Sequence, residues 1–147
     1  MSTMNRLWNV TNPYQGKDLK ILTVCSAGLL RSPTLARWLH RNFKNVNTRP
    51  VGTSQDHALI SLDEVHLRWA EVILCVDSST FNIVEDQLNT LGVEREIHSL
   101  NIPDNFGFGD ETLENIIKVQ IEELLKEVDK QTKEEIIFSD LSLLKRV

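Results

Sequence analysis

Two short, almost wholly apolar segments constrain the fold of this chain more than any other feature. Residues 20–24 read KILTV and residues 71–76 read EVILCV. Strands that are apolar throughout are typical of parallel sheets, because helices cover both faces of such sheets. Two further strands are predicted at 47–52 and 96–100. The sequence therefore predicts an α/β fold: a four-stranded parallel sheet with helices on both faces.

Each predicted strand is followed by a segment that favours a helix. Ser32-Pro33 fits a first helical turn, and helical spacing follows at Leu35, Trp38, Leu39 and Phe43. A short helix is expected at 62–69, and Asp77-Ser78 is a cap signal for the next one. The strongest amphipathic pattern covers 112–128. The segment 134–147 fits either a strand or a short helix.

Composition excludes several classes of protein. The chain has 147 residues, 41% of them hydrophobic, which suits one domain with its own core. Its 16 basic and 21 acidic residues give a net charge of −5, which disfavours nucleic acid as a partner. Two cysteines cannot build a disulfide framework and favour a reducing, cytoplasmic location. No stretch is long and apolar enough to suggest a membrane partner, and the oligomeric state is left open.

One loop carries the chemistry, and it reads VCSAGLLRSPT from Val24 to Thr34. Small residues after the first strand let backbone N–H groups turn inward beside a helix N-terminus, which makes an anion site. Arg31 adds a planar fork of donors that matches two phosphate oxygens. This environment favours the thiolate form of Cys25 and makes it a candidate nucleophile. The predicted phosphate-binding residues of the loop are Ser26, Ala27, Gly28, Leu29, Leu30 and Ser32.

The Cys-x5-Arg spacing alone is a weak signal, because eight arginines in the chain make a chance match common. The preceding strand, the small residues, the following Ser-Pro and the predicted helix strengthen it together. Cys75 lies inside EVILCV and is predicted to be an inert buried thiol. His40, His66 and His98 show no metal-ligand spacing with the cysteines, so neither a metal nor another cofactor is expected.

Three segments, in order, resemble those of the low-molecular-weight protein tyrosine phosphatases. VCSAGLLRSPT resembles the family's phosphate loop, GTSQDH its Gly-Thr-x-x-aromatic-His segment, and IPDNFGFGD the loop that carries the general acid. The likeness is closest to a small branch of predicted tyrosine phosphatases with CSxNxxRSPT and IPDxxxFxD motifs. By this resemblance Cys25, Arg31 and Asp104 are the catalytic residues, and His57 and Phe106 line the substrate pocket.

The resemblance also sets the expected domain limits and shows departures. It implies an N-terminal arm at 1–17, a phosphatase domain at 18–130, and a C-terminal extension at 131–147 that packs on the domain or mediates contacts. Gly28 stands where the family usually has asparagine, and Leu30 where many members have a second cysteine. Asp56 replaces an aromatic residue and Asn105 a proline. Asp110 is expected to cap the following helix.

The predicted function is a cysteine-dependent phosphomonoester hydrolase, a protein tyrosine phosphatase acting through a cysteinyl-phosphate intermediate. The expected partner is a phosphorylated protein or a small phosphomonoester. One alternative is a thiol-dependent arsenate reductase, which shares the family's fold but needs further cysteines. Another is a phospho-binding module, which needs no nucleophile.

Overall fold

The computed structural model describes residues 18–26, 30–54, 58, 60–105, 110–134 and 139–147. These residues form a four-stranded parallel sheet in the order β2-β1-β3-β4. The strands are β1 (Leu19–Cys25), β2 (Val46–Gly52), β3 (Val72–Cys75) and β4 (Glu96–Ser99). The helices are α2 (Arg31–Asn42), α3 (Glu64–Trp69), α4 (Ser78–Leu91) and α5 (Glu111–Lys133), followed by the 3-10 helix η1 (Asp140–Leu143). The predicted fold class is confirmed.

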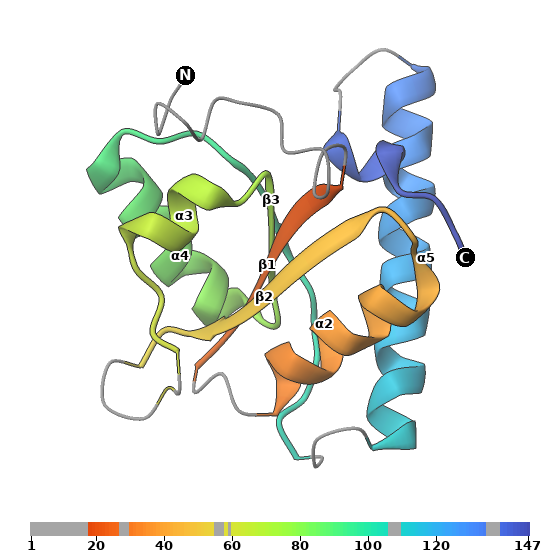
Figure 1. Ribbon diagram of the computed structural model, residues 1–147, viewed down its shortest axis with the longest axis horizontal. Coiled ribbons are helices and arrows are strands. Elements are labelled where there is room, and N and C mark those ends of the chain that lie inside the picture. Colours follow the sequence, from red (N-terminus) through yellow and green to blue (C-terminus); the bar gives the residue numbers. More distant parts are fainter. Residues whose placement is uncertain (1–17, 27–29, 55–57, 59, 106–109, 135–138) are drawn as a thin grey trace.

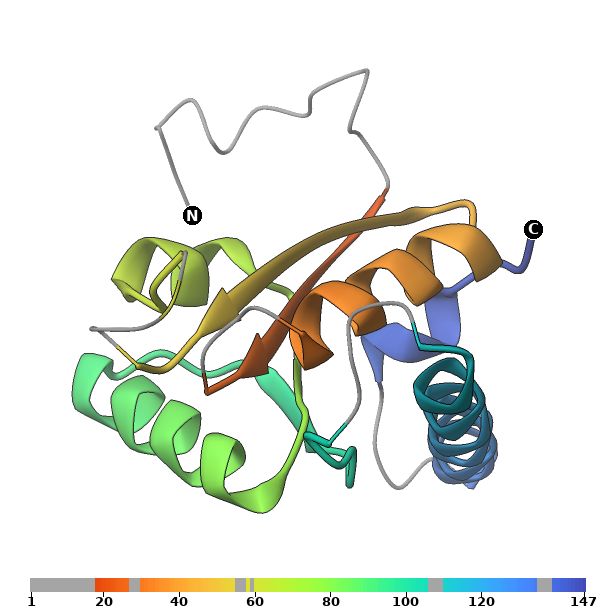
Figure 2. The same ribbon diagram turned by 90° about the horizontal axis from the view of Figure 1, so that it is seen from below.

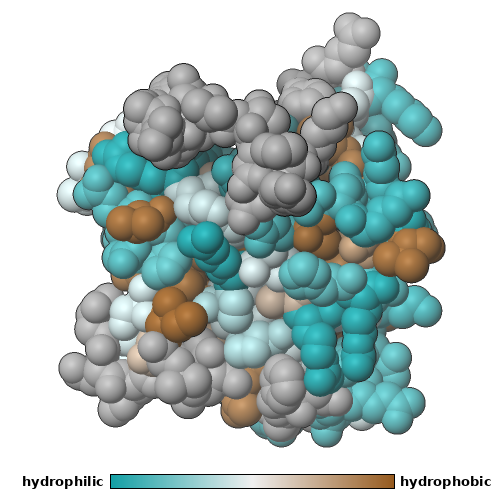
Figure 3. All heavy atoms as spheres, in the orientation of Figure 1, coloured by the Kyte–Doolittle hydropathy of each residue, from teal (hydrophilic) through white to brown (hydrophobic). Residues whose placement is uncertain are grey.

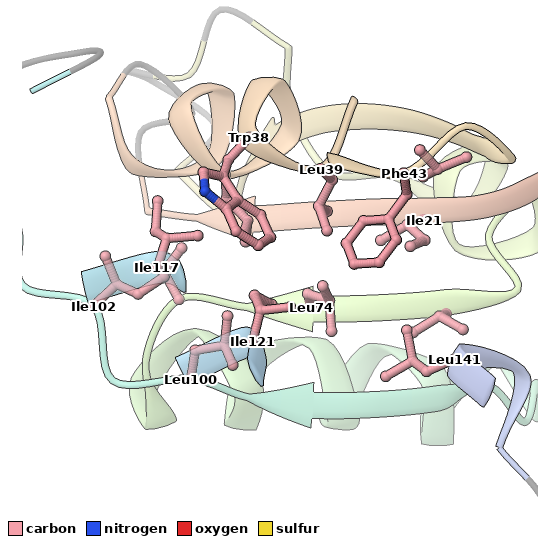
Figure 4. Packing of buried hydrophobic residues seen from close by; sticks show 14 of the residues in the cluster. Ile21, Trp38, Leu39, Phe43, Leu74, Leu100, Ile102, Ile117, Ile121 and Leu141 are labelled. Carbon is pink, nitrogen blue, oxygen red and sulfur yellow. The ribbon is translucent and has the colours of Figure 1, made fainter. Parts of the chain in front are cut away.

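The helices cover the two faces of the sheet in pairs. Helices α2 and α5 lie on one face, and α3 and α4 on the other, as the two views show (Figures 1 and 2). On the first face, Trp38 and Leu39 of α2 meet Ile117 and Ile121 of α5 over Leu74 of the sheet (Figure 4). Because the two central strands, β1 and β3, are covered on both sides, Ile21, Leu22, Ile73 and Leu74 are all fully buried.

The predicted elements agree with the observed ones except at particular ends. Helix α2 already begins at Arg31, so Pro33 is its third residue and lies within the first turn. Helix α3 begins at Glu64, later than predicted, because Asp63 accepts a hydrogen bond from the His66 N–H (3.0 Å) and caps it. Trp69, the last residue of α3, is partly buried against the core under α3 and α4, with the guanidinium carbon of Arg49 at 4.2 Å from its ring centroid.

The C-terminal segment 139–147 packs against residues distant in the sequence. Glu96 of β4 accepts hydrogen bonds from the Ser139 hydroxyl and from the Asp140 N–H, the latter at 2.7 Å. Leu141 is 2% exposed and belongs to the core under α2 and α5. Helix α5 runs past residue 130 to Lys133. The segment that the sequence left ambiguous forms a 3-10 helix at Asp140–Leu143.

We expect Leu141→Ala to lower the free energy of unfolding by about 2–5 kcal/mol, because it leaves a cavity in this core. The matched control is Leu143→Ala in the same 3-10 helix, where the side chain is 50% exposed. That control should change stability by less than about 0.5 kcal/mol. Urea unfolding followed by circular dichroism measures both. Equal effects of the two substitutions would show that Leu141 does not anchor the C-terminal segment.

The surface shown in Figure 3 is largely hydrophilic, and its apolar side chains are exposed singly. Within the residues that the structure describes, no helix has the length and apolarity needed to cross a membrane. The predicted N-terminal arm at 1–17 lies outside the described residues.

Candidate active site

The carboxyl ends of β1 and β2 bring the first two predicted segments together. Cys25 is the last residue of β1 and pairs in register with Gly52, the last residue of β2. Beyond the strands, the Thr53 N–H donates to the Cys25 carbonyl (2.9 Å), and the Ser54 N–H donates to the Ser26 carbonyl (2.8 Å). The start of the GTSQDH segment therefore lies against the loop that begins at Cys25.

A buried hydroxyl lies beside the Cys25 sulfur. The distance from Cys25 Sγ to Ser32 Oγ is 3.3 Å, and Ser32 Oγ in turn donates to the Val51 carbonyl at 3.3 Å. Ser32 is fully buried, and the Thr23 hydroxyl donates to its carbonyl oxygen at 3.0 Å. A hydroxyl hydrogen rotates to suit its acceptor, so Ser32 can donate to Cys25 when the sulfur is a thiolate. Ser32 is thus placed to stabilise the anionic nucleophile.

The N-terminus of α2 differs from those of α3, α4 and α5. Each of the other three is capped by an aspartate side chain: Asp63, Asp77 and Asp110 respectively. Helix α2 has Leu30 at the cap position, with no side-chain hydrogen bond there and no acidic residue in its first turn. The cap position and first turn of α2 therefore supply no carboxylate of their own to the positive end of the helix dipole, which suits an anion bound at the loop before it.

Arg31 is held through one of its terminal nitrogens. Its Nη1 donates to Asp77 Oδ2 at 2.9 Å and to the Ile102 carbonyl at 3.0 Å. Among the described residues, Nε and Nη2 have no hydrogen-bond partner. The side chain is only 8% exposed, and the contacts of Nη1 leave the edge formed by Nε and Nη2 without a hydrogen bond to the described residues. Two parallel N–H donors on that edge match two oxygens of a phosphoryl group.

Asp77 makes contacts with both of its carboxylate oxygens. Its Oδ1 caps α4 by accepting from the Thr80 N–H (2.8 Å) and hydroxyl (2.6 Å), while its Oδ2 accepts from Arg31. Burial alone would raise the pKa of Asp77, but the hydrogen bonds from Thr80 and Arg31 and the charge of Arg31 hold it below its usual value. Asp77 therefore faces Arg31 as a carboxylate at neutral pH.

The third predicted segment reaches the site through Ile102. Ile102 is 1% exposed, its N–H donates to the Val76 carbonyl (2.9 Å), and its carbonyl accepts from Arg31. Asp104 follows two residues later and is exposed. Two residues span at most about 7 Å of chain, so the backbone of Asp104 lies close to the Arg31 contact.

Asp110 accepts from the N–H groups of Thr112 and Leu113 and caps α5, which confirms its predicted role.

Comparisons with known proteins identify the fold. No family model matches the chain. No curated protein matches it either. Among solved structures it is similar to the YwlE arginine phosphatase from Geobacillus stearothermophilus, with a TM-score of 0.54 and 19% sequence identity over 78% of this chain and 96% of that one. The chain has the low-molecular-weight phosphatase-like fold. A YwlE mutant from Bacillus subtilis gives a TM-score of 0.48 at 19% identity, covering 79% of this chain and 99% of that chain.

Within this fold, the described residues bring together Cys25, Arg31, Ser32 and the backbone beside Asp104. Ser26 and Leu30, at the two ends of the loop, are exposed, Leu30 by 42%. Five residues predicted to contact substrate lie outside the described residues: Ala27, Gly28, Leu29, His57 and Phe106. Sequence reasoning recognised Asp77 only as a helix cap and missed its contact with Arg31. No local pattern signals a contact between residues 46 positions apart.

Cys75 is separated from Cys25 by the sheet itself. Val24, and not Cys25, is opposite Cys75 in the register of β1 and β3. Since successive side chains point to opposite faces, Cys25 belongs to the core under α2 and α5, and Cys75 to the core under α3 and α4. Burial, with a smaller effect from the charge of Asp77, raises the pKa of Cys75 to about 12. Cys75 is fully buried, and its prediction as an inert thiol agrees with this position.

Proposed function

We propose that this protein is a cysteine-dependent phosphomonoester hydrolase that acts on phosphorylated proteins. The observation that carries the proposal is the arrangement at the start of α2. Arg31, the first residue of the helix, is anchored through Nη1, and the next residue, Ser32, contacts the Cys25 thiol at 3.3 Å. A nucleophile, a bidentate donor and a helix N-terminus then converge on one loop. These three groups together suit cleavage of a phosphate ester through a covalent intermediate.

The proposed reaction has two steps. Cys25 attacks the phosphorus, so that an S–P bond forms while the bond from phosphorus to the leaving oxygen breaks. Arg31 and the N–H groups of α2 hold the equatorial oxygens, and Asp104 gives its proton to the leaving oxygen. Water then attacks the cysteinyl phosphate, Asp104 takes a proton from that water, and the Cys25 thiolate is restored as phosphate leaves.

The substrate residue is proposed to be phosphotyrosine, following the family resemblance. Leu30, the exposed apolar side chain at the start of α2, offers contact surface for an aromatic ring. Phosphoarginine is the second candidate, because a solved structure of similar fold is an arginine phosphatase. Its phosphoryl group is bound to nitrogen, so the leaving atom would then be nitrogen and the enzyme a phosphoramidate hydrolase. Turnover of peptides that carry either residue discriminates between them. The faster substrate by kcat/KM identifies the class, and equal inertness toward both would exclude both.

The two alternatives to hydrolysis fit the site less well. An arsenate reductase of this fold needs a second thiol, which attacks the nucleophile's sulfur in its arsenate adduct, so that a disulfide forms as arsenate is reduced to arsenite. Cys75 lies on the opposite face of the sheet from Cys25. A binding module that only holds a phosphorylated partner needs no thiol at the start of the phosphate-binding loop. Release of inorganic phosphate from p-nitrophenyl phosphate, with no added thiol, separates hydrolysis from both.

The proposed function is tested by alkylation with iodoacetate at pH 6, combined with assay of p-nitrophenyl phosphate hydrolysis. We expect the label on Cys25, located by peptide mapping, and a parallel loss of activity. Inorganic phosphate should slow both the labelling of Cys25 and the loss of activity. Cys75 should stay unlabelled, because only a thiolate reacts and burial keeps Cys75 protonated. Equal labelling of the two cysteines, or full activity after Cys25 is labelled, would contradict the proposal.

A further inference from the structure

Arg31 faces two requirements that oppose each other. Its side chain is 8% exposed, and a guanidinium removed from water at this depth needs a partner for its charge. Bidentate binding of a phosphoryl group, however, needs two of its N–H donors in one fixed orientation. A partner that accepted hydrogen bonds from Nε and Nη2 would occupy the donors that the phosphoryl group needs. A flexible partner would leave the guanidinium without a fixed orientation.

Asp77 meets both requirements. It accepts from Nη1 only, so the edge formed by Nε and Nη2 keeps its donors. The Ile102 carbonyl accepts from the same nitrogen at 3.0 Å, and two acceptors on one nitrogen fix the plane of the guanidinium more tightly than one. Asp77 itself is fixed, because Thr80 binds its other oxygen twice, through the N–H and the hydroxyl. Thr80 is 2% exposed and belongs to the first turn of α4.

We propose that Asp77 is a positioning residue that orients Arg31 for phosphoryl binding and transfer. This inference rests on the proposed function and extends it by a residue outside the three motif segments. Asp77 acts through Arg31 and does not contact the substrate. The start of α4 is thereby coupled to the phosphate site, since the carboxylate that caps the helix also fixes the arginine.

Asp77→Ser separates the two roles of the residue. Serine is a good N-cap and keeps the hydrogen bond to α4, but its short side chain does not reach Arg31. We expect kcat for p-nitrophenyl phosphate to fall about tenfold or more, and the dissociation constant of inorganic phosphate, measured by calorimetry, to rise at least about fivefold. The matched control is Asp63→Ser at the cap of α3, where the aspartate side chain contacts His66 and makes no contact with Arg31 among the described residues. It should change neither quantity by more than about twofold.

A double-mutant cycle shows whether Asp77 acts through Arg31. In an Arg31→Lys background the bidentate donors of the guanidinium are already lost. Adding Asp77→Ser to that background should therefore change kcat and phosphate affinity by less than about twofold. A full additional loss in that background would show that Asp77 acts independently of Arg31 and would overturn the proposal. Unchanged kcat and phosphate affinity in Asp77→Ser alone would also overturn it.

Failure of the proposed function gives a different result. A wild-type protein that binds phosphate but releases none from any ester is not a hydrolase, while the phosphate dissociation constants still test Asp77. If the wild-type protein turns over substrate and the Asp77→Ser variant has the same kcat and phosphate affinity, the proposed hydrolase function stands. Asp77 is then not a positioning residue.

Discussion

Cys25→Ser should abolish hydrolysis of p-nitrophenyl phosphate, with a loss of at least about 10³-fold in kcat, because a serine hydroxyl in this cradle is a far weaker nucleophile than a thiolate. The substitution changes the size of the side chain little and keeps a hydrogen-bonding group facing the Ser32 hydroxyl, which lies 3.3 Å from the Cys25 sulfur in the wild type. Arg31 and the start of α2 are unchanged. The variant should therefore still bind inorganic phosphate, with a dissociation constant measured by calorimetry close to that of the wild type.

The matched control is the same substitution at the other cysteine. Cys75→Ser places a hydroxyl in the fully buried core under α3 and α4 and should lower the free energy of unfolding by about 1–3 kcal/mol. At temperatures where this variant is folded, its kcat should equal that of the wild type. Residual turnover by Cys25→Ser above about a tenth of the wild-type rate would mean that another group is the nucleophile.

The part of the fold that the sequence predicted rests on local signals. Apolar runs such as KILTV and EVILCV identify buried strands, and Asp77-Ser78 identifies the start of α4, because each signal depends on residues close together in the chain. The parallel order of the strands follows from their alternation with helices. The thiol at the end of β1 was found in the same way, since the loop beside it is continuous in sequence.

The contacts that sequence reasoning missed join distant segments. Arg31 reaches Asp77 and Ile102, which lie 46 and 71 positions further along the chain. Ser139 reaches Glu96 across 43 positions. Such contacts depend on how the elements pack, and no periodicity or cap signal encodes them.

The role of Asp104 is a proposal that leaving-group chemistry can decide. An aryl group such as p-nitrophenolate departs with little help, whereas an alkoxide needs a proton in the transition state. Asp104→Asn cannot supply that proton. We expect it to slow p-nitrophenyl phosphate by roughly tenfold or less and alkyl phosphates by about 10²- to 10⁴-fold.

Asp110→Asn is the matched control, because it makes the same chemical change at the other aspartate of the IPDNFGFGD segment. Asparagine is an equally good cap, so the N–H groups of Thr112 and Leu113 keep an acceptor and α5 stays intact. The carboxylate of Asp110 is already committed to those two N–H groups, whereas Asp104 is exposed beside the segment that binds Arg31. Asp110→Asn should therefore leave the leaving-group dependence as it is in the wild type. A steeper leaving-group dependence in Asp110→Asn, with Asp104→Asn unaffected, would assign the acid to Asp110.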